Sequence, residues 1–222
     1  MRMESLAKKS LLWVAVAILL FVIVSAARSV AAELFSLAAS RTMQGWESVR
    51  QSPSVAQVES VARRFEFARF MANDDPVHHE NIARLSLLRA ALPDVTPAER
   101  KSLLQLGMSE IRTAIALRPV SPYSWTILLL IKRELDEFDA EFRHALHRAV
   151  ELGPWEPELL TSLADVGLSA WVKMPAAKQA LIQQVFVRGM ERQSNLMRDV
   201  ALAHRHECAT RATGGKQRAE CQ

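Results

Sequence analysis

The chain has 222 residues, half of them hydrophobic, and it contains few glycines and few aromatic residues. That length is enough for one domain and a membrane anchor, and the composition favours helices over strands. The formal charge is +4, but setting aside Arg2, Lys8, Lys9 and Glu4, at the extreme N-terminus, leaves 25 basic and 23 acidic residues, a net charge of +2. So weak a bias gives no support to nucleic-acid binding, and no nucleic-acid partner is expected.

An apolar segment follows this short charged stretch. It covers residues 11–27, 17 residues in all, which is the short end of the range for a transmembrane helix. The basic residues Arg2, Lys8 and Lys9 before it predict a cytoplasmic N-terminus and a body across the membrane, which in a bacterium is the periplasm. The tripeptides VSA and VAA at its end also fit cleavage of a signal peptide. The body is exported whether the segment is retained as an anchor or cleaved as a signal peptide. A retained anchor makes the chain a single-pass protein of the bacterial inner membrane.

Prolines that follow capping side chains predict where the helices of the body begin. Thr96 and Glu99 form a capping box around Pro97, and Gly153 is a natural C-cap. No stretch alternates strongly enough to predict a strand, so the fold class is all-α. The predicted helices cover roughly residues 53–72, 76–91, 97–117, 122–135, 138–152, 157–171, 175–193 and 195–208.

The helix over residues 138–152 is strongly amphipathic. One apolar stripe steps along it by 4, 3, 4 and 3 residues, which predicts that Phe138 and Phe142 are buried against the preceding helix. The rest of this helix is predicted to be a solvated face, and its polar residues are Glu141, Arg143, His144, His147 and Arg148.

A phrase occurs twice, as AIALRPVSPYSW at residues 114–125 and AVELGPWEPELL at residues 149–160, 35 residues apart. A fixed interval of this size is typical of helical repeats, with each phrase forming the turn between two helices. The phrase resembles the tetratricopeptide repeat, which implies antiparallel hairpins stacked as a divergent solenoid. The residues predicted to shape the two turns are Ala114, Leu117, Pro119, Pro122, Trp125, Ala149, Leu152, Gly153, Pro154, Trp155 and Pro157.

A second resemblance covers residues 111–171. The segments LRPVSPYSW, DEFDAEFRHALHRAVELGPWEPE and GLSAW, in that order, resemble the VpsP family of polysaccharide biosynthesis proteins, and ELGPWEPE is the most specific of the matching stretches. The resemblance implies a small, single-span bacterial protein associated with an exopolysaccharide system. It implies no catalytic residues, because none can be carried over to this chain.

Several histidine, glutamate and cysteine residues are candidates for metal binding or a disulfide, and each also fits a purely structural role. Glu141 and His144 form half of a di-iron helix motif with no second copy, and the pair His78-His79 is predicted to lie in a solvated helical turn. His204 and Cys208 are four residues apart and make at most a weak metal site. Cys208 and Cys221 form a disulfide in one interpretation and remain two unpaired thiols in the other.

Three segments are predicted from these patterns: a membrane anchor over residues 1–28, a periplasmic helical repeat-like domain over residues 29–208, and a C-terminal tail over residues 209–222. The expected function is that of a non-enzymatic interaction module without cofactor or metal. It would bind protein partners of a polysaccharide assembly or export system at the inner membrane. The alternatives are direct glycan binding in the same pathway and an enzyme with an unrecognised site.

Overall fold

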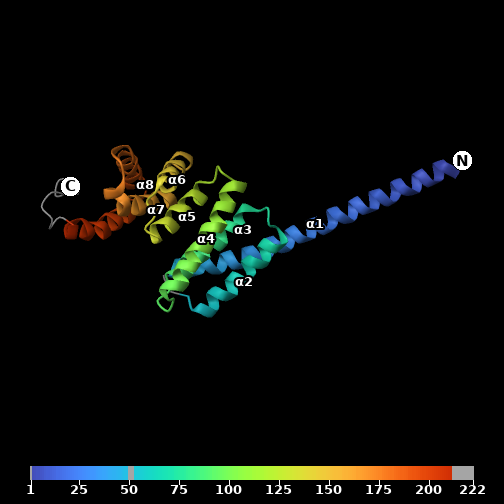
Figure 1. Cartoon of the computed structure of the whole chain (residues 1–222), viewed down its shortest axis with the longest axis horizontal. Helices are drawn as coiled ribbons and strands as arrows, with labels where there is room; N and C mark the ends of the chain where they lie inside the picture. The colour runs from blue at the N-terminus through green and yellow to red at the C-terminus, as the bar shows by residue number, and fades with distance from the viewer. Residues whose placement is uncertain (1, 50–52, 212–222) are drawn as a thin grey trace. The chain divides into compact units, whose positions relative to one another are not determined.

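The computed structural model describes residues 2–49 and 53–211, and all regular structure among them is helical, which confirms the all-α prediction (Figure 1). The elements are α1 (Arg2–Val49), α2 (Val55–Met71), α3 (Pro76–Ala90), α4 (Pro97–Leu117), α5 (Pro122–Glu134), α6 (Ala140–Leu152), α7 (Pro157–Ala170), the 3-10 turn η1 (Trp171–Lys173) and α8 (Ala176–Arg211). The chain divides into two compact units, Met1–Ile82 and Ala83–Gln222, which are described separately.

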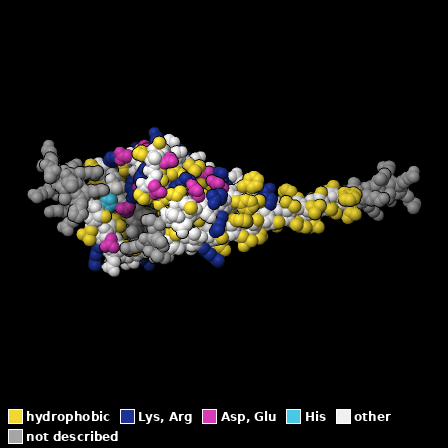
Figure 2. Space-filling view, turned by 90° about the horizontal axis from the view of Figure 1, so that it is seen from below, with side chains coloured by type: hydrophobic (Ala, Val, Ile, Leu, Met, Phe, Trp, Pro, Cys, Tyr) yellow, Lys and Arg dark blue, Asp and Glu magenta, His cyan; other side chains and the backbone are white. Residues whose placement is uncertain are grey.

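The helix α1 dominates the first unit. Its 48 residues run without a break through residue 28, so the predicted anchor and the segment after it share one helix about 72 Å long. Within it, Leu12–Trp46 contains a stretch that is long and apolar enough to span a membrane. The side chains of this stretch are largely exposed, and Figure 2 shows hydrophobic groups along it on the face in view.

The helices α1 and α2 contact each other and form a helical hairpin. Ser54, not Ser52 as predicted, caps α2: its hydroxyl accepts from the Gln57 N–H at 3.4 Å, and its own N–H donates to the Gln57 side chain at 2.8 Å. This reciprocal capping box moves the start of the helix beyond Pro53. The buried residues recur at steps of 3 and 4 on both helices: Ala32, Ser36, Ala39, Met43, Val58, Val61, Phe65 and Ala68.

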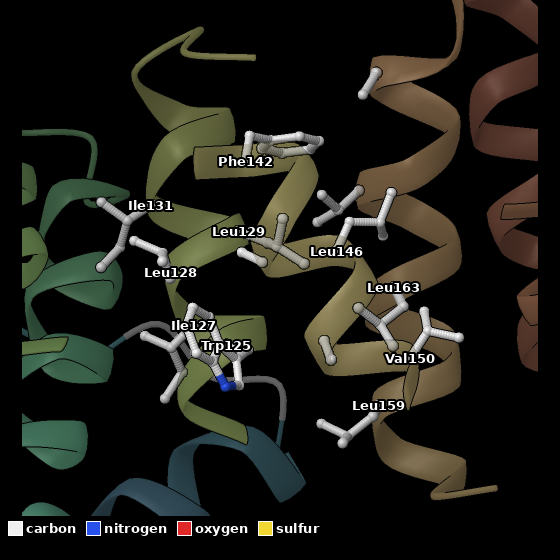
Figure 3. Packing of buried hydrophobic residues seen from close by; sticks show 14 of the residues in the cluster. Trp125, Ile127, Leu128, Leu129, Ile131, Phe142, Leu146, Val150, Leu159 and Leu163 are labelled. Carbon is white, nitrogen blue, oxygen red and sulfur yellow. The ribbon is translucent and has the colours of Figure 1, made fainter. Parts of the chain in front are cut away.

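In the second unit, α5 is the central helix, because it contacts α4, α6 and α7. Buried apolar residues surround it between Trp125 and Ile131, and Figure 3 shows Leu129 on the side of α6 and α7 and Ile127 and Ile131 on the opposite side. Phe142 of α6 is completely buried, as predicted, and its ring meets the ring of the partly buried Phe138 edge to face at 5.0 Å.

The long helix α8 is interrupted at Gln193, whose backbone is not helical (φ −144°, ψ 59°). A β-carbon added to Gly189 would lie 2.6 Å from the Met197 Sδ, although eight residues separate the two positions. In a straight helix they would be about 12 Å apart, so the segments before and after Gln193 fold back on each other. The predicted pair of helices, ending near residue 193 and beginning near residue 195, has the same boundary.

Candidate interaction surface

The two copies of the repeated phrase lie against each other. One forms the turn between α4 and α5, and the other forms the turn between α6 and α7. A β-carbon added to Gly153 would lie 3.0 Å from Pro122 Cβ and 2.9 Å from Leu159 Cδ1. The sequence similarity between residues 114–125 and 149–160 therefore corresponds to a contact between two adjacent turns.

The helix after each turn begins at the predicted proline: α5 starts at Pro122 and α7 starts at Pro157. In the first turn, Ser121 caps α5 by accepting from the Ser124 N–H at 3.3 Å. The indole Nε1 of the buried Trp125 donates to the Pro119 carbonyl at 2.9 Å, which fixes the chain across the turn.

The predicted turn residues have different environments. The two alanines, Ala114 and Ala149, are fully buried, and Leu152 is partly buried. Leu117 is also among the residues predicted to shape the turns, but it lies exposed at the end of α4. Gly153 caps α6 as predicted, yet its φ of −127° is not left-handed, so the close approach of Pro122 and Leu159 is what favours glycine there.

Large apolar side chains remain exposed along these turns. The exposed fractions are 44% for Leu117, 64% for Val120, 43% for Tyr123 and 49% for Trp155. We call these four residues the proline-turn surface. Trp155 is among the residues predicted to shape the turns, but half of its side chain is accessible. Several large apolar groups exposed on two adjacent turns are a candidate binding surface.

Charged groups border the proline-turn surface on two sides. Partial burial and the carboxylates of Glu156 and Glu158 raise the pKa of the Tyr123 hydroxyl, because all of them disfavour the phenolate. On the other side, the guanidinium carbons of Arg188 and Arg192 lie 5.1 Å and 5.7 Å from the centroid of the Trp155 indole. These are cation–π distances, and they hold the ring in place.

A buried ammonium group organises the opposite end of the α5–α6 hairpin. The Lys132 side chain is only 1% exposed, and its Nζ donates to Glu137 at 3.1 Å, Asp139 at 3.0 Å and Glu141 at 2.9 Å. Glu141 also accepts two hydrogen bonds from the Arg112 guanidinium, at 3.0 Å and 2.7 Å. Glu141, predicted to be solvated, instead links α4, α5 and α6.

These contacts shift the pKa values of the cluster in opposite directions. Desolvation is the largest single influence on Lys132 and lowers its pKa, but the three carboxylates together raise the pKa above the usual lysine value. The hydrogen bond from Arg112, followed by that from Lys132, lowers the pKa of Glu141. For Asp139, desolvation is outweighed by bonds from the Phe142 N–H and Lys132, so its pKa is lowered as well. The contacts favour the charged forms of Lys132, Asp139 and Glu141, so the cluster is a charged clamp on the turn.

A second polar chain crosses the same unit. Arg133 of α5 pairs with Asp165 of α7, and the other carboxylate oxygen of Asp165 lies 2.8 Å from the His204 Nε2 of α8. His204 is thus bound to a carboxylate. Cys221 lies outside the described residues, and only the backbone is described for Cys208. The predicted disulfide and the weak metal pair therefore stay predictions.

The pair His78-His79 was predicted to lie in a solvated turn, and this is wrong. Both imidazoles are buried in the first turn of α3, together with the side chain of Glu80. His79 Nε2 lies 3.0 Å from the Asn73 carbonyl, so this ring closes the turn between α2 and α3. His78 Nε2 lies 4.0 Å from a carboxylate oxygen of Asp75. Adjacent helical residues point about 100° apart, so this turn is covered on more than one side.

Sequence reasoning did not find Lys132. One signal was available: a lysine directly after the apolar run Ile127–Ile131, with acidic residues five, seven and nine positions later. Glu141, one of its three partners, is also bound by Arg112 of another helix, and periodicity within one helix cannot reveal such a partner.

The chain matches no protein-family model, and no curated protein is significantly similar to it.

Proposed function

We propose that this protein is a single-pass anchored adaptor of the bacterial inner membrane. Its body, a divergent tetratricopeptide-like stack in the periplasm, would bind a protein partner in exopolysaccharide assembly or export. The observation that carries this proposal is the proline-turn surface: Leu117, Val120, Tyr123 and Trp155 stay accessible on two turns that pack together. The polysaccharide context is supported by the resemblance of residues 111–171 to the VpsP family.

The chemistry of the surface favours a protein partner over a sugar. Leu117 and Val120 are aliphatic, and burying such groups against another apolar surface yields roughly 25 cal/mol for each Å² removed from water. Sugars have few continuous apolar faces to offer them. Tyr123 and Trp155 add aromatic anchors of the type enriched in protein interfaces, and the arginine pair beside Trp155 supplies a polar rim.

The test compares two triple variants of the full-length chain. The first, Val120→Ser with Tyr123→Ser and Trp155→Ser, alters the proline-turn surface. The control alters three similarly exposed apolar residues elsewhere in the same unit. If the proposal is correct, the first variant loses polymer production and partner co-purification at normal protein level, while the control retains both. Equal behaviour of the two would refute the role of this surface. The control positions are Leu106→Ser, Val172→Ser and Leu202→Ser.

Contact-based function also predicts how polar substitutions behave. Single alanine changes at Glu141, His144 and His147 are expected to alter polymer output modestly, whereas loss of a catalytic group commonly lowers a rate by orders of magnitude. One change that abolishes output in a stably expressed protein, with partner association intact, would replace the adaptor proposal by an enzymatic one.

Direct glycan binding is a second candidate, and the exposure of Tyr123 and Trp155 favours it, since aromatic faces stack on sugar rings. Under this alternative, purified polymer binds the full-length chain, and Trp155→Ala weakens that binding at least tenfold. An adaptor has no measurable affinity for the polymer.

Topology is tested with a reporter that is active only in the cytoplasm, fused after Gln222. The proposed orientation predicts no signal, because the basic flank of Lys8 and Lys9 holds the N-terminus inside. A strong signal would reverse the orientation. Release of the body into the soluble periplasmic fraction would instead indicate a cleaved signal peptide.

A further inference from the structure

The C-terminal end of α2 is fastened to α1 where the apolar run of α1 ends. The run stops at Ala27, and the next residue, Arg28, donates from its guanidinium to the carbonyls of Phe70 at 3.4 Å and Met71 at 3.2 Å. These carbonyls belong to the last turn of α2 and lack partners within the helix. A cation near a helix C-terminus also complements the helix dipole.

A second contact fixes the alignment of the two helices. The rings of Phe35 on α1 and Phe67 on α2 lie 4.6 Å apart between centroids. Moving from Phe35 to Arg28 covers about 10 Å along α1, and moving from Phe67 to Met71 covers about 6 Å along α2. The helices are therefore antiparallel, and the last turn of α2 stands within about one helical turn of the end of the apolar run.

Aromatic side chains are unusually accessible at this position. Phe70 is 73% exposed, and the pair Phe35 and Phe67 remains 43% and 37% exposed. Apolar exposure continues on α1 beyond Arg28, at Val30 and Leu34. Such a group would be costly in water, but it matches the boundary between lipid acyl chains and headgroups, where aromatic rings and basic residues anchor membrane helices.

We propose that the last turn of α2 lies in the membrane interface, with the Phe70 ring at the acyl–headgroup boundary and the Arg28 guanidinium at the level of the lipid phosphates. The partner of this surface is the lipid bilayer. The inference rests on the proposed membrane-spanning role of α1, because the span sets the depth of Arg28. The headgroup zone adds about 5–7 Å on each side of the hydrocarbon core, which accommodates one helical turn.

The experiment measures the depth of a fluorescent label in the full-length chain. Both cysteines are replaced by serine, and single cysteines labelled with an environment-sensitive fluorophore are introduced at Phe70 or Asn73. The second position, in the adjacent turn, keeps the Phe70 ring intact. The protein is reconstituted into phosphatidylcholine–phosphatidylglycerol vesicles that carry nitroxide quenchers at a shallow or a deep position of the lipid.

The matched control is Ala56→Cys, which is exposed on the same helix about 21 Å from Phe70. A label at Phe21, inside the apolar run, reports the span itself. We expect the shallow quencher to reduce the emission of the labels at Phe70 and Asn73 at least twofold more than that of the label at Ala56. The deep quencher should act on the label at Phe21.

Three outcomes would overturn the proposal, each for a different reason. If the label at Phe21 is quenched from the deep position while Phe70 and Asn73 behave like Ala56, α1 spans the bilayer but the end of α2 does not touch it. A blue-shifted label at Phe70 that escapes both quenchers would place a second copy of the chain on this surface. If the label at Phe21 also escapes the deep quencher, the membrane-spanning role of α1 fails together with the interfacial contact.

Discussion

Replacing Gly153 by alanine tests the packing of the two proline turns directly. The added β-carbon would lie 2.9 Å from Leu159 Cδ1, and 3.0 Å and 3.2 Å from the Cβ and Cγ of Pro122. The leucine methyl could move, but the proline ring is held in the first turn of α5 and cannot rotate away. The turn between α6 and α7 must therefore shift if the substituted chain is to fold.

The magnitude follows from two opposing effects. Overpacking a tight site usually costs about 1–3 kcal/mol. Alanine also restricts the unfolded chain, which returns about 0.4–1 kcal/mol where the native backbone accepts it. Gly153 has φ −127° and ψ 53°, outside the left-handed region, so no further backbone strain arises. We expect a net loss of about 1–2 kcal/mol in the free energy of unfolding.

Circular dichroism of the detergent-solubilised full-length chain measures this loss, and each kcal/mol corresponds to roughly 2–4 °C in melting temperature for a domain of 150–250 residues. Gly45→Ala is the matched control: nothing lies within 4 Å of the added β-carbon. Because Gly45 is inside α1, alanine there should stabilise the helix by about 0.5–1 kcal/mol.

Unchanged stability of the Gly153→Ala variant would contradict the contact between the two turns. A double-mutant cycle with Leu159→Ala sharpens the test, because removing the leucine methyl groups opens space for the new β-carbon. The penalty of Gly153→Ala should then fall by at least about 0.5 kcal/mol, the usual size of coupling between touching residues. Strict additivity of the two substitutions would place Leu159 away from Gly153.

Substitutions at three other positions probe the α5–α6 hairpin. Asp139→Ala should cost about 0.5–2 kcal/mol through loss of the helix cap, whereas Asp139→Asn keeps the cap and isolates the bond to Lys132, both measured by urea unfolding. The pKa of Glu141 is lower in the folded state, so its contribution to the stability of the fold is complete above the unfolded value of 4.5 and disappears as the pH falls through the folded value. Glu141→Gln should therefore flatten the fall in melting temperature between pH 6 and about 3. An unchanged slope would exclude this role of Glu141. Phe142→Ala should lower the free energy of unfolding by about 3–5 kcal/mol, and a loss near zero would contradict its complete burial.

Features that depend on neighbouring residues could be predicted from the sequence. The capping box of Thr96 and Glu99 is present, with the Thr96 N–H 3.0 Å from the Glu99 carboxylate, because both partners lie within one helical turn. The starts of α5 and α7 at prolines, and the burial of Phe142 by its stripe, follow from equally local rules. Ser54 shows the limit: it competes with Ser52, and the better-placed Gln57 decides between them.

Features that depend on distant partners could not be predicted. The cluster around Lys132 extends to Arg112 of another helix, which pairs with Glu141, and the carboxylate partner of His204 is Asp165, 39 residues earlier. The burial of His78 and the exposure of Leu117 depend on which neighbouring segments cover each side of a helix. A hydrophobic pattern indicates that a face exists, but it does not indicate how far a neighbour extends over it.

The unbroken course of α1 through residue 28 has a geometric consequence. Because one rigid helix carries both the apolar run and the face that binds α2, the angular position of the hairpin around the helix axis is fixed by the number of residues between them. Each inserted residue turns the outer part by about 100° and lifts it by about 1.5 Å. Two alanines inserted after Ala27, which leaves Arg28 with the face that binds α2, would rotate the α2 hairpin by about 200°, whereas seven would nearly restore its direction at about 10 Å greater height. The length of this helix therefore sets the direction of the hairpin around the helix axis, and a function that depends on direction would return with the seventh residue.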